Sequence, residues 1–274
     1  HRPVFADAKV SVWREGWKHS RGKRIFILYN MRRALVVGGA NGIGLSIATE
    51  LAALEESEKV YILDKAVLAE EFMNPKFDAA QFDLTQSDYS IFDNYRDIDT
   101  LMITAGFGRL SLFRDIDESH IMASFNVNTI PVMRIVKHFY DRIESKDDFY
   151  CGVMVSISGF MTSPFFSVYG ATKAALKVFI ESVNAELTKA GVSNRILNVS
   201  PGPLKGTSFS NAKTDLSVTA PMAKEIISHL WMKDDLFIPQ YEEVFKEVLD
   251  RYHKDFRAEG LHSYDYKLES GRVK

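Results

Sequence analysis

The stretch Ala34-Leu-Val-Val-Gly38-Gly-Ala-Asn-Gly42-Ile-Gly44 decides the fold of this chain of 274 residues. Four apolar residues without alternation predict a strand that is buried on both faces. The glycines then predict a tight turn, and the apolar spacing over Leu45–Leu54 predicts a helix that follows directly. Backbone N–H groups and the helix dipole at such a helix start attract a phosphate. The candidate residues of this cradle are Gly38, Asn41, Gly42, Ile43 and Gly44.

A carboxylate stands where a nucleotide bound at this cradle would place its ribose. Asp64 ends the next predicted strand, twenty residues after Gly44. At this place a carboxylate accepts hydrogen bonds from the ribose hydroxyls of a dinucleotide and repels a 2′-phosphate. We therefore favour NAD(H) as the cofactor. NADP(H) stays open because the ammonium of the neighbouring Lys65 can turn towards a 2′-phosphate, and a tight turn without any ligand is the simpler alternative.

Short apolar runs alternate with helical patterns from Met31 onward, which is typical of βαβ units around a parallel sheet. We predict central strands at 34–37, 60–63, 100–103, 152–155 and 195–199. Besides the helix after the glycines, long helices are predicted over Asp117–Ile143 and Ser167–Lys189. Right-handed crossovers then lead to an α/β fold, a single doubly wound Rossmann-type domain over residues 31–274 with a mainly parallel sheet flanked by helices.

Tyr169 and Lys173 stand four residues apart in Tyr-Gly-Ala-Thr-Lys and share one face of a predicted helix. Tyrosine alone is a poor base, because its pKa near 10 leaves little phenolate at neutral pH. An ammonium within about 4–6 Å favours the phenolate and lowers that pKa. The pair therefore predicts proton transfer, with Tyr169 as acid or base. Without further support, a core tyrosine beside a solvated lysine would be the simpler interpretation.

The composition agrees with one α/β domain. Hydrophobic residues make up 46% of the chain, which is enough for one large core, and the formal net charge is −2. This charge gives no basic field for nucleic acid, and no apolar run reaches the roughly 20 residues of a membrane-spanning helix. The only cysteine, Cys151, excludes a disulfide within the chain, and the scattered histidines predict no metal site. We expect a cytoplasmic protein with no nucleic-acid or membrane partner.

The first 30 residues differ from the rest, with seven lysines and arginines against two acidic residues. Their apolar run, Ile25–Leu28, is too short for the core of a secretory signal. We expect residues 1–30 to be a basic extension that is non-native or weakly ordered, with Met31 as the natural start.

Five motifs together resemble the compact form of the short-chain dehydrogenase/reductase family, from Met31 to about Phe209. The family's Thr-Gly-x-x-x-Gly-x-Gly is matched by residues 37–44, with Val37 in place of threonine. Its Asn-Ala-Gly after the fourth strand is matched by residues 104–106, where Thr104 departs from the pattern. The remaining matches are Ala105 and Gly106 in that motif, Asp83-Leu84 near the adenine, Asn128 in a helix, and Pro201-Gly202 after the sixth strand.

The resemblance implies a nicotinamide-dependent oxidoreductase that acts on a secondary alcohol or a ketone. It implies that Lys173 also holds the nicotinamide ribose and that the Leu204 backbone contacts the nicotinamide amide. Asn128 would bend its helix and hold a water that links Lys173 to solvent. The family usually forms homodimers or homotetramers through helices, here Asp117–Ile143 and Ser167–Lys189, so a homo-oligomer is implied as well.

The family also places a serine about thirteen residues before the tyrosine, where its hydroxyl donates to the substrate oxygen. Ser156 has this spacing, and we favour it as the catalytic serine. Aligning residues 156–159 with the family's Asn-Ile-Ser-Ser instead puts Gly159 at the catalytic place. Ser158, or no serine at all, therefore stays open.

Residues 203–274 are expected to form the substrate lid and the C-terminal helices, because open α/β sheets bind ligands beyond the carboxyl ends of their strands. The lid candidates are Thr207–Asn211 and a helix over Ala220–Trp231. An apolar stripe from Val244 to Phe256 predicts a helix that packs on its own domain. The aromatic residues that would line an apolar pocket, or belong to the core, are Phe160, Phe165, Phe166 and Phe209.

Two functions of other classes stay open. A non-catalytic NAD(H)-binding sensor or scaffold is motivated by the departures at Val37 and Thr104 and by the open position of the serine. A nucleotide-sugar epimerase or dehydratase also uses Tyr-x-x-x-Lys, but the spacing of the glycines over 38–44 and the short C-terminal tail oppose it.

Overall fold

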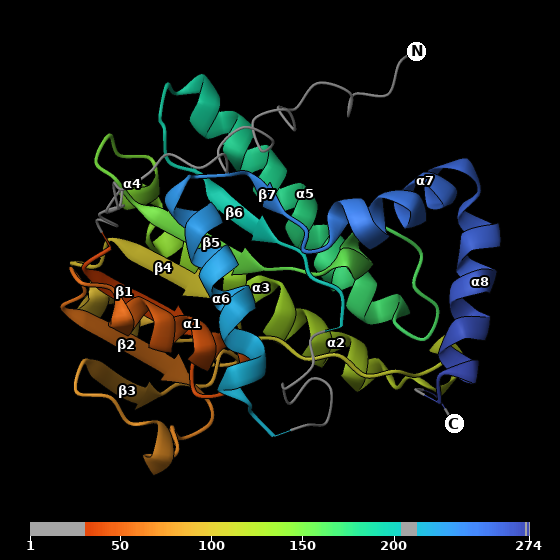
Figure 1. Ribbon diagram of the computed structural model, residues 1–274, viewed down its shortest axis with the longest axis horizontal. Coiled ribbons are helices and arrows are strands. Elements are labelled where there is room, and N and C mark those ends of the chain that lie inside the picture. Colours follow the sequence, from red (N-terminus) through yellow and green to blue (C-terminus); the bar gives the residue numbers. More distant parts are fainter. Residues whose placement is uncertain (1–30, 204–212, 272, 274) are drawn as a thin grey trace, which may run out of the picture.

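The computed structural model describes residues 31–203, 213–271 and 273, and it contains a seven-stranded parallel sheet in the order β3-β2-β1-β4-β5-β6-β7. This architecture confirms the predicted doubly wound α/β fold (Figure 1). The strands are β1 (Arg33–Val37), β2 (Lys59–Asp64), β3 (Phe77–Gln81), β4 (Thr100–Ile103), β5 (Tyr150–Met154), β6 (Ile196–Val199) and β7 (Leu236–Phe237).

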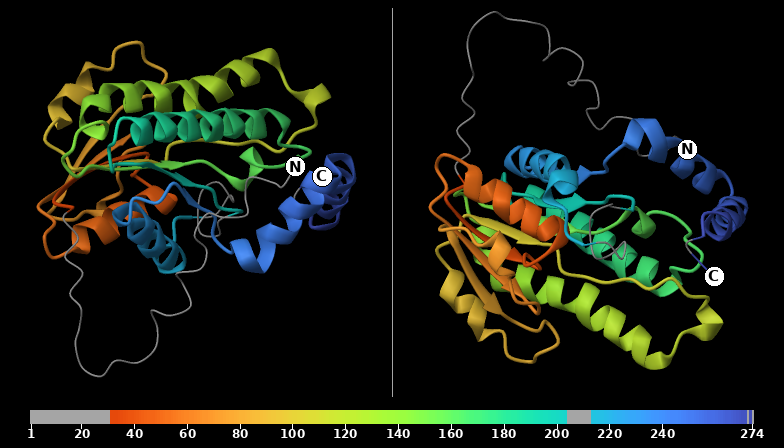
Figure 2. Two further views of the ribbon diagram at one scale, coloured as in Figure 1. Left: turned by 90° about the horizontal axis from the view of Figure 1, so that it is seen from above. Right: turned by 60° about the horizontal axis from the view of Figure 1, so that its bottom comes forward.

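Helices cover both faces of the sheet (Figure 2). One face carries α1 (Gly42–Ala53) and α6 (Leu216–Trp231), and the other carries α2 (Glu118–Asn128), α3 (Ile130–His138), α4 (Tyr140–Ile143) and α5 (Ser167–Lys189). The pair α7 (Lys246–Lys254) and α8 (Phe256–Glu269) lies to one side, beyond the carboxyl ends of the strands (Figure 1). Shorter turns are η1 (Glu70–Phe72), η2 (Ser90–Tyr95), η3 (Phe113–Asp115), η4 (Ile157–Gly159) and the π-helical η6 (Tyr241–Phe245).

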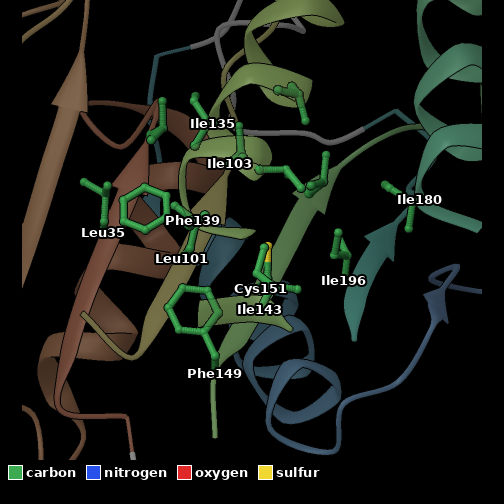
Figure 3. Close-up of a cluster of buried hydrophobic side chains, with 14 of the residues drawn as sticks. Leu35, Leu101, Ile103, Ile135, Phe139, Ile143, Phe149, Cys151, Ile180 and Ile196 are labelled. Carbon is green, nitrogen blue, oxygen red and sulfur yellow. The ribbon is translucent and has the colours of Figure 1, made fainter. Parts of the chain in front are cut away.

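Two layers of apolar side chains, one on each face of the sheet, explain why the central strands have continuous apolar runs. Every residue of β4, β5 and β6 is buried. On the α3–α5 face, Leu101 and Phe139 lie in a cluster with Cys151, whose thiol pKa is raised to about 12 by burial (Figure 3). Strand packing against helices on both sides removes this apolar surface from water, which is the main driving force for folding.

The prediction of one continuous helix over 117–143 is wrong, because this segment forms three consecutive helices, α2, α3 and α4. The first break is at Thr129, whose φ of −122° and ψ of −62° are not helical, and Pro131 follows within the first turn of α3. The second break is at Phe139. Proline at a helix start is favourable but cannot continue a preceding helix, so α2 ends at Asn128.

Within the described residues, no helix combines the length and the apolar character that crossing a membrane requires. Residues 1–30, with the predicted N-terminal extension, lie outside the described residues. The lid candidate Thr207–Asn211 also lies outside them.

Candidate active site

A cavity of about 760 Å³ lies at the carboxyl ends of the strands. It lies between β1 and β4, where the order of the strands in the sheet reverses. Open α/β sheets bind ligands at this switch point. Most of the predicted site residues line it: Gly38, Asn41, Gly42, Ile43, Gly44, Asp64, Asp83, Leu84, Ala105, Gly106, Ser156, Tyr169, Lys173, Pro201 and Gly202. Leu204 lies outside the described residues, and Asn128 lies behind the cavity wall rather than in it.

The glycine turn is shaped by contacts that leave no room for side chains. Gly38 has a φ of +87°, and a Cβ there would lie 2.5 Å from the Ala105 nitrogen. A Cβ on Gly44 would overlap the Gly38 carbonyl oxygen and the Thr104 hydroxyl. The backbone therefore stays bare at the start of α1, where a phosphate would bind. This cradle fits the diphosphate of a dinucleotide cofactor.

Thr104 departs from the family pattern but still supports the turn. Its hydroxyl lies 2.9 Å from the Gly38 carbonyl oxygen and 3.1 Å from that of Val37, and it can donate to either. The backbone N–H groups of Thr104 and Ala105 also donate to the Val37 carbonyl. The end of β4 is thus joined to the end of β1 by both side-chain and backbone hydrogen bonds.

The carboxylate of Asp64 is fixed at the end of β2. One of its oxygens accepts the N–H of Ala40 at 3.0 Å, and the other accepts the N–H of Ala66 at 2.9 Å. The neighbouring Lys65 is turned to Asp83, with 2.9 Å between Nζ and the carboxylate. Hydrogen bonds from Thr85 and this lysine lower the pKa of Asp83 to about 2. Two carboxylates therefore flank the cavity at this end, and Lys65 is paired with one of them.

Ser156 and Tyr169 meet at the other end of the cavity. The two side chains are hydrogen-bonded, and this bond lowers the tyrosine pKa, but burial has the larger effect and raises the pKa of Tyr169 to about 12. The sequence led us to expect that Lys173 lowers the pKa of Tyr169, and in the structure it does not. The reason is geometric: the lysine Nζ donates to the Met154 carbonyl oxygen at 2.9 Å and lies 5.7 Å from the centre of the tyrosine ring.

Lys173 is buried, with 3% of its surface exposed, and burial lowers its pKa from the usual 10.5 to about 8. Asn128 is close by, since its Oδ1 and the lysine Nζ lie 3.3 and 3.4 Å from the place that a Cβ on Gly106 would take. The asparagine amide bonds to the backbone N–H and carbonyl of Phe107 and to the Thr172 hydroxyl. It thereby holds the loop after β4 against α5, and its predicted water relay stays a prediction.

The loop after β5 bears on the choice between the two serines. Ser156 caps η4, and its hydroxyl oxygen accepts the N–H of Ser158 at 3.1 Å. A Cβ on Gly159 would lie 2.8 Å from the backbone of Lys173, so a side chain has no room there. The geometry therefore supports Ser156 beside Tyr169, whereas Ser158 contributes its backbone N–H.

The C-terminal helix pair is attached to the loop before α5, and its end reaches the cavity, neither of which the sequence indicated. Lys267 in α8 donates to the Ser163 hydroxyl at 2.9 Å and to the Pro164 carbonyl at 2.7 Å. Gly271, just after α8, lines the cavity. Of the predicted pocket aromatics, Phe166 lines the cavity, Phe165 is buried against Tyr264, Phe160 lines a separate groove, and Phe209 lies outside the described residues.

Comparison with known proteins agrees with this geometry. A family model described as short chain dehydrogenase matches residues 32–216. A short-chain type dehydrogenase/reductase of Sinorhizobium fredii is 30% identical over 183 residues, which cover 65% of this chain and 72% of that protein. Retinol dehydrogenase 8 of Bos taurus is 26% identical over 233 residues, which cover 79% of this chain and 73% of that protein.

Solved structures share the fold. A short chain dehydrogenase/reductase family protein has a TM-score of 0.67 at 22% identity, and covers 77% of this chain and 97% of its own. An alcohol dehydrogenase from the archaeon Thermococcus sibiricus, complexed with 5-hydroxy-NADP, has a TM-score of 0.64 at 19% identity, and covers 76% of this chain and 95% of its own.

Proposed function

The chain belongs to the short-chain dehydrogenase family, and from this premise we propose that it is a nicotinamide-dependent oxidoreductase that interconverts a secondary alcohol and a ketone. One observation carries the proposal. The cradle at the start of α1 and the hydrogen-bonded pair of Ser156 and Tyr169 open into the same cavity. A cofactor held at the first would place its nicotinamide near the second.

The proton chemistry follows from the state of three side chains. The raised pKa of Tyr169 keeps its proton in place at neutral pH, so the phenol is an acid ready for the oxygen of a ketone. Ser156 holds the phenol and can turn its own hydroxyl towards the same oxygen. Lys173, with a pKa near 8, is mostly charged at pH 7, but its Nζ is bonded to the Met154 carbonyl oxygen and lies 5.7 Å from the centre of the tyrosine ring, so it would stabilise the phenolate that remains only after turning towards it. The nicotinamide, when bound, supplies or accepts the hydride.

We propose NAD(H) rather than NADP(H) as the preferred cofactor. The fixed carboxylate of Asp64 would accept ribose hydroxyls and repel a 2′-phosphate. Lys65, the residue that argued for NADP(H), is paired with Asp83. The solved alcohol dehydrogenase with 5-hydroxy-NADP shows that the fold also accommodates the phosphorylated form.

The substrate end of the cavity supports an uncharged, apolar substrate. Phe166, whose ring centre lies 5.2 Å from that of Tyr169, lines it together with Leu110 and Val127. Among the described lining residues the charged side chains are Asp64, Lys65, Asp83 and the buried Lys173. Among the described residues of this part of the wall, none would bind the diphosphate of a nucleotide sugar, which gives no support to an epimerase. One relative is named a retinol dehydrogenase; retinol is an apolar alcohol, although a primary one, so the name supports the apolar character of the substrate and not its secondary hydroxyl.

The proposal is tested with the substitution Tyr169→Phe and a panel of apolar secondary alcohols and ketones. The variant should bind NADH as the wild type does and lose turnover by a factor of about 10³ or more, because the transferred proton has no source. Tyr140→Phe, at a tyrosine in α4 outside the cavity, is the matched control and should keep full turnover. Turnover that survives in Tyr169→Phe would refute the mechanism. Cofactor binding with no wild-type turnover on any member would favour the sensor.

We also propose that the chain forms a homodimer or homotetramer through α2 and α5. Met122 in α2 and Val178 in α5 are 58% and 59% exposed, so each of the two helices presents an apolar side chain that a second copy would cover. Light scattering on Met122→Asp should then show a smaller particle than the wild type, and an unchanged mass would contradict this interface.

A further inference from the structure

The loop that leads into α5 holds a strained residue directly before a residue of the candidate active site. Phe165 has a φ of +66°, in the left-handed region that a bulky side chain rarely adopts, and its carbonyl oxygen accepts the N–H of Ser111 at 2.9 Å. The next residue, Phe166, lines the cavity, and its ring centre lies 5.2 Å from that of Tyr169. A strained backbone persists only where its surroundings hold it, so the contacts of this loop decide where the Phe166 ring lies.

One face of α8 supplies such contacts. Gly260, Tyr264 and Lys267 stand at positions i, i+4 and i+7 of this helix and therefore share one side of it. A Cβ on Gly260 would lie 3.0 Å from the Thr162 side chain, so the helix and the loop approach each other closely there. The ring of Tyr264 lies against the buried ring of Phe165, with 4.6 Å between their centres. The helix thus contacts the strained residue itself.

Lys267 is the charged member of this face. It is 6% exposed, and its Nζ donates to the Ser163 hydroxyl at 2.9 Å and to the Pro164 carbonyl oxygen at 2.7 Å. The same Nζ lies 5.6 Å from the centre of the Phe166 ring. Burying an ammonium costs free energy, and an apolar side chain would fill the place without that cost. Its hydrogen bonds are directional, so the lysine fixes the two residues that precede the strained one.

The helix that carries Lys267 is itself held in place. Asp255 caps the start of α8 by accepting two backbone N–H groups of its first turn, both at 3.0 Å. The carboxylate of Glu259, which is 6% exposed, pairs with Arg251 of α7 at 2.6 Å. The lysine is therefore carried on a braced helix pair and not on a free tail.

Phe166 lies between two spaces. It lines the cavity with the catalytic candidates, and it also lines a groove that runs past Phe160 and Leu249. Ser158 is likewise part of the lining of both. The position of the Phe166 ring therefore determines how much room a substrate has beside Tyr169.

We propose that Lys267 is a positioning residue that holds Phe166 beside Tyr169, and that the site thereby selects compact apolar ketones over bulky ones. This inference rests on the proposed function and adds a determinant of substrate size to it. Without the two hydrogen bonds of Lys267, Phe165 can leave the left-handed region. The Phe166 ring then moves towards the groove, so a compact substrate loses a contact and a bulky one gains room.

The test measures kcat and KM with NADH for a compact ketone, cyclohexanone, and a bulky one, benzophenone. Lys267→Met keeps a similar length and removes both hydrogen bonds. It should lower the ratio of kcat/KM for cyclohexanone to that for benzophenone about tenfold, mainly through KM, because the apolar wall beside the substrate is displaced. The control Lys254→Met, at an exposed position in α7, should keep this ratio within about twofold of the wild type.

A double variant shows whether the lysine acts through Phe166. Phe166→Leu alone should change the ratio in the same direction, and adding Lys267→Met to it should change the ratio by less than about twofold more, since residues that act as one unit are not additive. Tyr264→Leu removes the ring beside Phe165 and should shift the ratio in the same way, so the inference is also tested if Lys267→Met does not fold.

The outcomes separate this inference from the proposed function. A ratio that is unchanged in the folded variants, or effects of Lys267→Met and Phe166→Leu that multiply, would overturn the positioning role and leave the proposed function intact. An equal loss of kcat on both ketones would also overturn it, because the lysine would then be merely structural. A wild type that binds NADH and reduces neither these two ketones nor any other member of the panel would overturn both.

Discussion

Replacing Lys173 by methionine is expected to change how the stability of the protein depends on pH. Its ammonium is buried and has the Met154 carbonyl oxygen as a hydrogen-bond acceptor. Burial lowers its pKa from 10.5 to about 8, so the folded protein holds this charge at a cost in free energy below pH 8. Methionine has a similar length and no charge, and removes that cost.

The sign and the size follow from proton binding. Between pH 8 and 10.5 the unfolded chain keeps the Lys173 proton that the folded protein has released. The unfolded state then binds more protons, and the free energy of unfolding rises with pH. The difference between 10.5 and about 8, at about 1.4 kcal/mol for each pH unit, amounts to roughly 3 kcal/mol. The wild type should gain this amount relative to Lys173→Met as the pH rises through that window.

The assay is urea unfolding of both proteins, without added nucleotide, at pH 7, 8, 9 and 10. Cys151 and Tyr169 have raised pKa values and lower the stability above about pH 9 and 10, but both proteins contain them, so the difference isolates the lysine. Lys254→Met, at an exposed position in α7, is the control and should follow the wild type. If the free energies of unfolding of the wild type and Lys173→Met differ by the same amount at every pH, the reasoning is refuted, because the ammonium of Lys173 would then be solvated in the folded protein.

Three further substitutions test the cradle, the cofactor choice and the serine. Gly44→Ala should lower the free energy of unfolding by about 1–3 kcal/mol and weaken NADH binding, because the new Cβ would overlap the Gly38 backbone. The control Gly191→Ala, which has open space and a φ of +73°, should lower the free energy of unfolding by only about 1 kcal/mol. Equal losses of the two variants in urea unfolding would contradict the overlap at Gly44. In a fluorescence titration, Asp64→Asn should shift the ratio of NADPH to NADH affinity at least about fivefold towards NADPH, because it removes the negative charge that would repel the 2′-phosphate. An unchanged ratio would mean that the carboxylate does not select the cofactor. Ser156→Ala should lower kcat about 10²-fold or more on the best substrate of the panel, and Ser158→Ala less than about threefold; the reverse order would assign the role to Ser158.

The central strands could be predicted from the sequence because each is an apolar run buried on both faces. The edges of the sheet could not. In β3 only Phe77 is buried and the other four residues are exposed, so no apolar run marks the strand. The strand β7 has only two residues, Leu236 and Phe237. Edge strands depend on hydrogen bonds to a neighbour already in place, and such pairing has no local signal.

The candidate site likewise has a part that the sequence predicts and a part that it does not. Residues close together in the sequence, such as the glycines of the cradle or Tyr169 and Lys173, form patterns with a fixed geometry. Thr214, whose side-chain oxygen accepts the Gly42 N–H, lies 172 residues from it, and Lys267 lies 104 residues from Ser163, so neither contact follows from spacing. The raised pKa of Tyr169 could not be predicted either, because it depends on burial and on the direction of the Lys173 side chain.

The two departures from the family pattern at the cradle have physical substitutes in the structure. Thr104 bonds with its hydroxyl to the carbonyl oxygens of residues 37 and 38, so a shorter side chain still joins β4 to the glycine turn. Val37 is 1% exposed and contributes to this network through its carbonyl oxygen, which any residue would provide. These departures therefore give no support to a non-catalytic sensor. The choice between sensor and enzyme depends on the pair of Ser156 and Tyr169, and the pair is hydrogen-bonded in the cavity that holds the cradle.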